Sequence, residues 1–139
     1  MRDFAARGIA RAAMQPHCAG DEIKFYGVLG SPFFHWYYSD VASDGNGTGV
    51  APHGRRNPLD VAALRRLADR AAAAAGLEIF GGDVIIGPAG EQTLIDLNDW
   101  PSFAPCRDRA SEAIADYLVR RVDAAWNPGL VSSANQSAV

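Results

Sequence analysis

Residues 78–103 read EIFGGDVIIGPAGEQTLIDLNDWPSF, and this stretch decides the fold. Two runs rich in aliphatic residues, 78–86 and 92–98, flank the turn sequence Gly87-Pro88-Ala89-Gly90. Aliphatic runs of this length on either side of a Gly/Pro turn are typical of paired β-strands. The stretch therefore predicts a β-hairpin.

The second strand of this hairpin is expected to have one polar and one apolar face. Because side chains alternate along a strand, Asp96, Asn98 and Leu94 would point one way. Ile95 and Leu97 would point the other way, toward the core. The polar face then carries a carboxylate and an amide oxygen side by side.

A loop of about six residues between the strands would place Asp83, on the first strand, across from Asp96, with the two carboxylates roughly 5 Å apart. Opposed like charges destabilise a sheet, so either one carboxyl group is protonated or a cation lies between them. Two carboxylates and the amide oxygen of Asn98 are hard ligands that suit Mg²⁺ or Mn²⁺. The alternative is a solvated sheet face that binds nothing.

Upstream of this hairpin, residues 12–18 and 22–29 are predicted to be extended and joined by residues 19–21. Residues 33–38 (FFHWYY) form a short aromatic strand that pairs with 22–29 in a first hairpin. Residues 40–58 are rich in Gly, Asp, Asn and Pro, which is typical of a mobile loop.

Two helices complete the pattern. The first is predicted to have Asn57 as its N-cap and Pro58 at its first position, and to end at Gly76. The second covers about residues 106–126. Their buried faces are expected to comprise Leu64, Leu67, Ala68, Ala71 and Ala75 in the first, and Ala110, Ala113, Ile114, Tyr117, Leu118, Val122 and Ala125 in the second.

The order strands, helix, strands, helix predicts an α+β fold. It would be an antiparallel sheet of two hairpins with two helices packed on one face. A chain of 139 residues that is 48% hydrophobic can bury one core. We place that single domain at residues 1–126 and a flexible tail at 127–139.

Composition and charge exclude several classes of protein. A net charge of −3 disfavours nucleic acid and anionic membranes as partners. No run approaches the roughly 20 apolar residues of a membrane span. The N-terminus lacks the apolar core of a secretory signal, although an Arg-bearing organellar presequence stays open. The two cysteines, Cys18 and Cys106, form no disulfide framework or metal pair, so a cytoplasmic protein is expected.

The motif Gly81-Gly82-Asp83, followed by a turn and by Asp96-Leu97-Asn98-Asp99-Trp100-Pro101, resembles the C-terminal metal-binding hairpin of the ATP-grasp superfamily. The Asp at the acidic position is similar to the inositol-phosphate-kinase-like branch, whereas most carboxylate–amine ligases have Glu there. The resemblance implies that Asp83, Asp96 and Asn98 hold the Mg²⁺ or Mn²⁺ that bridges the phosphates of ATP. Ser102 stands where those enzymes usually have Gly, and it is a candidate for binding phosphate or substrate.

The segment before the first hairpin is similar to the hinge strand of the same superfamily. The resemblance implies that Gln15, His17 and Cys18 meet the adenine of the nucleotide. It also implies that Asp21 or Glu22 holds the ribose. The alternative is that these are polar residues of a turn and of a strand end.

The basic residues comprise twelve arginines and a single lysine, Lys24. Lys24 matches the strand after the hinge, where kinase-like members carry a basic residue that faces phosphates or an anionic substrate. Arg55 and Arg56, at the end of the loop, are further candidates for binding an anionic substrate. The alternatives are an exposed edge-strand lysine that blocks aggregation and a solvated arginine pair. His35 is expected to be a packed or rim histidine.

The resemblance covers about residues 12–125, whereas a complete ATP-grasp enzyme also has an upstream domain and a first ATP subdomain. We therefore expect this chain to supply one half of the ATP clamp, with another polypeptide or upstream sequence supplying the other. The implied reaction transfers the γ-phosphate of ATP to a carboxylate (ligase) or a hydroxyl (kinase) of an anionic small molecule or peptide. The alternative is a non-catalytic fragment, or a small module that binds a divalent cation or a partner chain.

Overall fold

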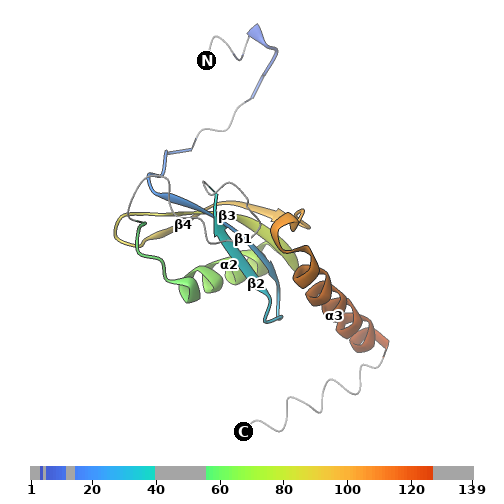
Figure 1. Ribbon diagram of the computed structural model, residues 1–139. Helices are drawn as coiled ribbons and strands as arrows, with labels where there is room; N and C mark the ends of the chain where they lie inside the picture. The colour runs from blue at the N-terminus through green and yellow to red at the C-terminus, as the bar shows by residue number, and fades with distance from the viewer. Residues whose placement is uncertain (1–3, 5, 12–14, 40–55, 127–139) are drawn as a thin grey trace.

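A computed structural model of the chain describes residues 4, 6–11, 15–39 and 56–126. They form an α+β fold in which two helices contact a four-stranded antiparallel sheet of order β2-β1-β3-β4 (Figure 1). The elements are β1 (Asp21–Val28), β2 (Phe34–Tyr38), α2 (Val61–Ala75), β3 (Ile79–Ile86), β4 (Gln92–Asp99), the 3-10 turn η1 (Ala104–Cys106) and α3 (Arg107–Trp126). The predicted class, an antiparallel sheet of two hairpins, is confirmed.

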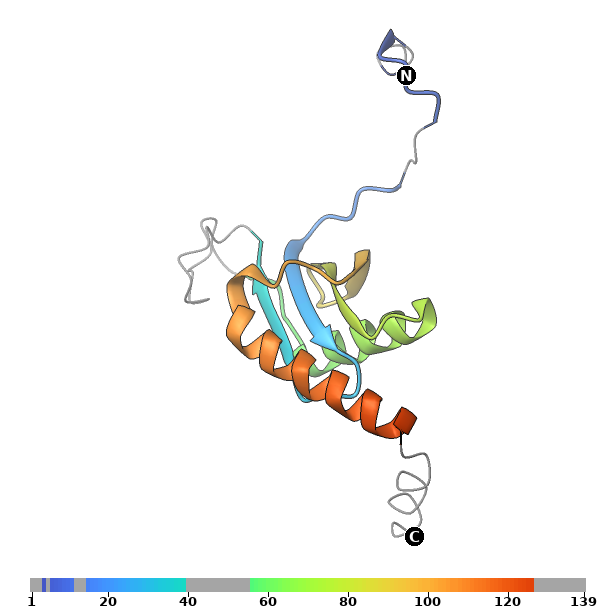
Figure 2. The same cartoon turned by 90° about the vertical axis from the view of Figure 1, so that its right-hand side faces the viewer.

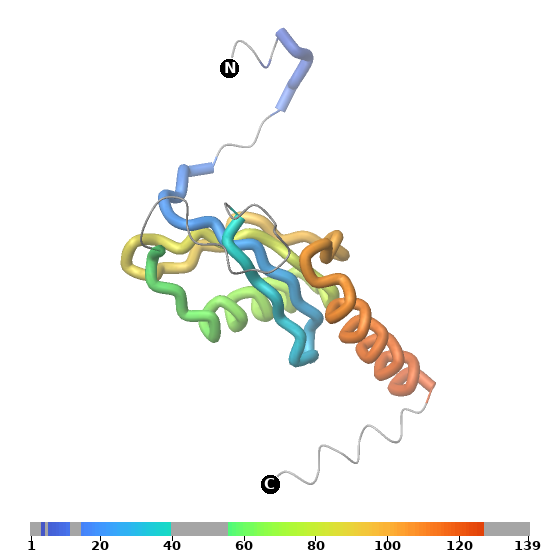
Figure 3. The backbone as a smooth tube through the Cα atoms, viewed as in Figure 1, coloured from blue at the N-terminus to red at the C-terminus, as the bar shows by residue number. Residues whose placement is uncertain are grey.

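Strand β1 of the first hairpin lies in the interior of the sheet, and β2 lies at one edge. The backbone trace in Figure 3 shows β1 between β2 and β3. Residues 15–18, part of the segment 12–18 that was predicted to be extended, form no strand of the sheet. Residues 12–14, the loop segment 40–55 and the tail 127–139 lie outside the described residues.

The second hairpin, of β3 and β4, brings the two predicted aspartates together. Asp83 lies directly opposite Asp96, and Gly81 lies opposite Asn98. Residues two apart on a strand share a face, so Asp96 and Asn98 lie on the same side of the sheet. The juxtaposition of the two carboxyl-bearing positions is confirmed.

A β-bulge corrects the predicted faces of β4. Beyond Asp96 the pairing shifts by one residue, so that Leu94 lies opposite Val84 and Ile95 has no partner on β3. Leu94 and Leu97 both pack against the core, whereas Ile95 is exposed. The prediction that Leu94 accompanies Asp96 and that Ile95 is buried is wrong, because the extra residue reverses the alternation.

The two helices pack on opposite faces of the sheet (Figure 2). Ile23 and Phe25 of β1 join α2 in one apolar cluster, whereas Tyr26 and Val28 join α3 in a second. Because neighbouring side chains of a strand point to opposite faces, the prediction of both helices on one face is wrong. β1 carries apolar side chains on both faces, and α2 packs on one face while α3 packs on the other.

The first residues of α2 are capped by a residue other than the predicted one. Asp60 is the N-cap, and its carboxylate accepts a hydrogen bond of 2.9 Å from the backbone N–H of Ala63. Asn57 lies before the first turn of α2, which begins at Val61, and its side-chain amide donates to the carbonyl oxygen of Ile86, at 2.8 Å. Gly76 ends the helix in the left-handed conformation with φ 70°, as predicted.

The buried faces of the helices are narrower than expected. In α2 the buried residues are Leu64, Ala68 and Ala72, whereas Ala75 is exposed. In α3 only Ala110 and Ala113 are buried, with Ile114 and Tyr117 packed partly against them. Predicted burial is wrong for Leu118, Val122 and Ala125, which are exposed because the second half of α3 runs past the sheet (Figure 1).

Across the described stretches, neither helix combines the length and the apolar character that crossing a bilayer requires.

Candidate functional site

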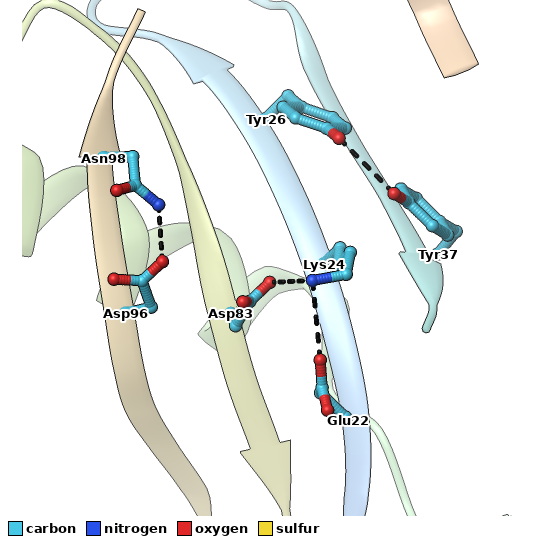
Figure 4. A network of polar contacts seen from close by, with 7 residues as sticks. All are labelled: Glu22, Lys24, Tyr26, Tyr37, Asp83, Asp96 and Asn98. Atoms are coloured by element: carbon cyan, nitrogen blue, oxygen red, sulfur yellow. Dashed lines mark hydrogen bonds and ion pairs between the residues drawn. The ribbon is translucent and has the colours of Figure 1, made fainter. Parts of the chain in front are cut away.

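The sheet face that bears Lys24 and Asp83 is called the polar face here. Helix α3 packs on one end of this same face, against Tyr26 and Val28 of β1. The strand pairing sets Lys24 of β1 opposite Asp83 of β3, and Asp83 opposite Asp96 of β4. These three residues form a row across neighbouring strands, with Tyr37 of β2 beyond Lys24 (Figure 4). The row therefore joins residues from both hairpins.

Lys24 bridges two carboxylates, one in this row and one two residues away on β1. Its ammonium lies 2.9 Å from Oδ1 of Asp83 and 3.5 Å from Oε1 of Glu22. The hydrogen bond to Asp83 raises the pKa of Lys24 above its ordinary value. Lys24 lies on an interior strand, which overturns the alternative of an edge-strand lysine. The ammonium supplies Asp83 with a cationic partner from within the chain.

Asp96 and Asn98 form the outer part of the site. The side-chain amide of Asn98 donates a hydrogen bond to Oδ2 of Asp96, and both side chains are exposed on β4 (Figure 4). In the part of the chain that the structure describes, no three His, Cys, Asp or Glu side chains converge. The candidate oxygen ligands are thus the carboxylates of Asp83 and Asp96, on neighbouring strands, and the side-chain amide of Asn98.

A second row, one pleat along the sheet, is aromatic. It runs from His35 through Tyr26 to Gly81 and Asn98. The hydroxyl groups of Tyr26 and Tyr37 lie 3.3 Å apart, and the ring of His35 stacks on that of Tyr26 with centroids 6.3 Å apart. Burial raises the pKa of Tyr26 and lowers that of His35. His35 is a packed histidine, as expected.

Asp21 and Arg56 are engaged with each other at the start of β1. Nη1 of Arg56 lies 3.7 Å from Oδ1 of Asp21, and its guanidinium lies 3.8 Å from the centre of the Tyr38 ring. The backbone N–H of Asn57 donates to Oδ2 of Asp21, at 2.7 Å. Alternation places Asp21 on the face opposite Lys24. This pair joins the segment before α2 to the sheet, and Arg55 lies outside the described residues.

The remaining candidates lie outside both rows. Gln15 and His17 are exposed in the segment before β1, and Cys18 is half-buried there. Ser102 is exposed beyond the end of β4, next to Phe103, whose ring packs 5.3 Å from that of Tyr26. The structure brings Glu22, Lys24, Asp83, Asp96 and Asn98 onto one face, and it does not bring Asp21 or Arg56 there.

The sequence did not predict that Glu22 pairs with Lys24, or that Tyr26 and Tyr37 lie beside it. Glu22 had been assigned to the ribose, and Tyr26 and Tyr37 had no assignment. The alternation of Glu22, Lys24 and Tyr26 along β1 was the available signal. Tyr37 joins them only through the pairing of β1 with β2.

The Lys24–Asp83 pair predicts a loss of stability in alkali. Folding raises the pKa of Lys24, so its contribution is full below the ordinary pKa of 10.5 and is lost as the pH rises through the folded value. The raised pKa of Tyr26 acts in the same direction above its ordinary value of 10.0. Urea unfolding at several pH values above about 9 should show a decline that is shallower in Lys24→Met. Identical declines would contradict a stabilising role for the pair.

No protein-family model matches the chain, and no curated protein matches it.

Proposed function

We propose that this chain is the metal- and nucleotide-binding half of an ATP-grasp enzyme. Asp83, Asp96 and Asn98 would hold Mg²⁺ or Mn²⁺ on the polar face of β3 and β4. The observation that carries the proposal is the register of this hairpin, which sets Asp83 opposite Asp96 with Asn98 on the same face. The motif Gly81-Gly82-Asp83 leads into that register, as the resemblance requires.

The donor set suits a hard dication that also binds phosphate. Mg²⁺ is usually held by one or two carboxylates and completes its octahedron with water and nucleotide phosphates. When bound, the ion would neutralise charge on the phosphates of ATP. Asp96 and Asn98 are exposed, so an oxygen ligand from a nucleotide has access to the same point.

The reaction that fits such a site is transfer of the γ-phosphate of ATP. The acceptor would be a carboxylate in a ligase, which passes the resulting acyl phosphate to an amine, or a hydroxyl in a kinase. Lys24 would orient an anionic group of the nucleotide or of the substrate. The substrate would be an anionic small molecule or peptide. A positive charge placed beforehand near a transferring phosphoryl group lowers the barrier by several kcal/mol.

The second half of the clamp would come from another segment or another chain. Phosphoryl transfer depends on positioning, and one sheet face holds a nucleotide from one side only. We also propose that the protein works in the cytoplasm, where a reducing environment suits its two free thiols, Cys18 and Cys106.

The test is calorimetry of ATP binding at saturating Mg²⁺. The substitution Asp96→Ala removes one proposed ligand from an exposed position, so we expect an intact fold and about 100-fold weaker ATP binding, about 2.7 kcal/mol. The matched control is Asp99→Ala on the same strand. Asp99 lies opposite Phe80, a core residue of the other face, so its loss should leave the affinity unchanged.

Three outcomes would contradict the proposal. They are no ATP binding by the unsubstituted chain with Mg²⁺ present, full affinity in Asp96→Ala, and an equal loss of affinity in Asp96→Ala and Asp99→Ala. A chain that binds Mg²⁺ but does not bind ATP at saturating Mg²⁺ would instead favour the alternative of a cation-binding module.

A further inference from the structure

Lys24 lies at the point where the proposed metal site meets the rest of the polar face. Its ammonium touches Asp83, one of the proposed ligands, and Glu22, which belongs to the same strand. The chain has no other lysine. With three carboxylates and one ammonium, Glu22, Lys24, Asp83 and Asp96 together carry two net negative charges, the amount that one dication neutralises.

The ammonium and a dication would compete for the same carboxylate. The Lys24–Asp83 hydrogen bond of 2.9 Å occupies Oδ1, and the ammonium repels any second cation placed a few ångströms away. Displacing it is feasible, because the Lys24 side chain is 36% exposed and Glu22 remains as a second partner. A released ammonium then lies beside the site with one weaker partner and a free capacity to donate.

We propose that Lys24 is the resting counterion of the metal site. The dication displaces its ammonium from Asp83, and the ammonium then binds the anionic phosphate group that accompanies the metal. The inference rests on the proposed function and adds to it a coupling between metal binding and ATP binding. Metal alone binds weakly because Lys24 opposes it, and metal with ATP binds well because Lys24 gains a new partner. By linkage, each ligand strengthens the other by the same factor.

The experiment measures binding of Mn²⁺ alone by electron paramagnetic resonance, and then binding of ATP at saturating Mn²⁺. In Lys24→Met we expect Mn²⁺ alone to bind about tenfold more tightly, because the opposing charge is gone. ATP at saturating Mn²⁺ should bind about tenfold more weakly, because its cationic partner is gone. Lys24→Arg keeps the charge and should resemble the unsubstituted chain for Mn²⁺ alone.

In Lys24→Met the expected changes in affinity for Mn²⁺ and for ATP have opposite signs. Damage to the fold would instead weaken the binding of both ligands. Lys24→Gln is the second variant, should Lys24→Met fail to fold. Mn²⁺ should also raise the melting temperature of either neutral variant by more than that of the unsubstituted chain.

Two failures can be told apart with the Asp96→Ala variant. If neither neutral variant binds Mn²⁺ more tightly than the unsubstituted chain, while Asp96→Ala loses the ion, the counterion role is wrong and the proposed function stands. If Asp96→Ala binds Mn²⁺ as well as the unsubstituted chain, the metal site is wrong and the counterion role fails with it.

Discussion

The substitution Gly82→Ala is expected to lower the free energy of unfolding by at least about 3 kcal/mol. Gly82 lies on β3 where this strand meets β4, opposite Leu97. A Cβ at this position would overlap the backbone carbonyl oxygen of Asp96 and lie 2.8 Å from Cζ of Phe25. Backbone cannot move aside as a flexible side chain can, so β3 and β4 must separate where Asp83 faces Asp96.

Urea unfolding followed by circular dichroism measures this loss. The matched control is Gly30→Ala, in the turn after β1, where a Cβ would meet nothing within 4 Å. Its backbone has φ 71°, so this control should cost only about 1 kcal/mol from strain. If Gly82→Ala costs no more than Gly30→Ala, the close approach of the two strands is wrong. A folded Gly82→Ala chain should also bind Mn²⁺ poorly, because its two carboxylates would be displaced.

The substitution Phe80→Ala is expected to cost about 3–5 kcal/mol, a large part of the roughly 5–15 kcal/mol that stabilises a typical domain. Phe80 is fully buried between the sheet and α2. Its ring meets that of Phe25 edge-on with centroids 6.3 Å apart, and it packs on Gly27, where a Cβ would overlap it. Loss of the ring leaves a cavity that these rigid neighbours cannot close.

Thermal and urea unfolding measure this cost, with Ile95→Ala as the control. Ile95 is the exposed residue of the bulge in β4, so its truncation should change the free energy of unfolding by less than about 1 kcal/mol. Similar losses in the two variants would place Phe80 outside the principal core.

The sequence predicted the local parts of this fold well. The turn Gly87-Pro88-Ala89-Gly90 and its flanking aliphatic runs predicted the β3–β4 hairpin, but not its register beside the turn, where Ile86 pairs with Gln92 and a bulge at Ile95 restores the pairing of Asp83 with Asp96. Gly76 gave the end of α2, because a left-handed residue favours glycine. The predicted N-cap of α2 is wrong: Asn57 and Asp60 are both good cap residues, and the helix begins at Val61 with Asp60 as its cap.

For the candidate site, the opposition of Asp83 and Asp96 follows from one hairpin and was predicted. The contact of Lys24 with Asp83 was not, because the two residues are 59 positions apart and meet only where β1 pairs with β3. The ion pair of Asp21 with Arg56 was not predicted either, because the two residues are far apart in the sequence.

The amino-acid order by itself determined the hairpins and the helix end at Gly76, because each depends on residues close together in the chain. Tertiary structure alone decided which face each helix covers, the bulge at Ile95 and the placement of Lys24 between Glu22 and Asp83. These features depend on the packing of distant segments, where the burial of side chains on both faces of β1 outweighs local preference.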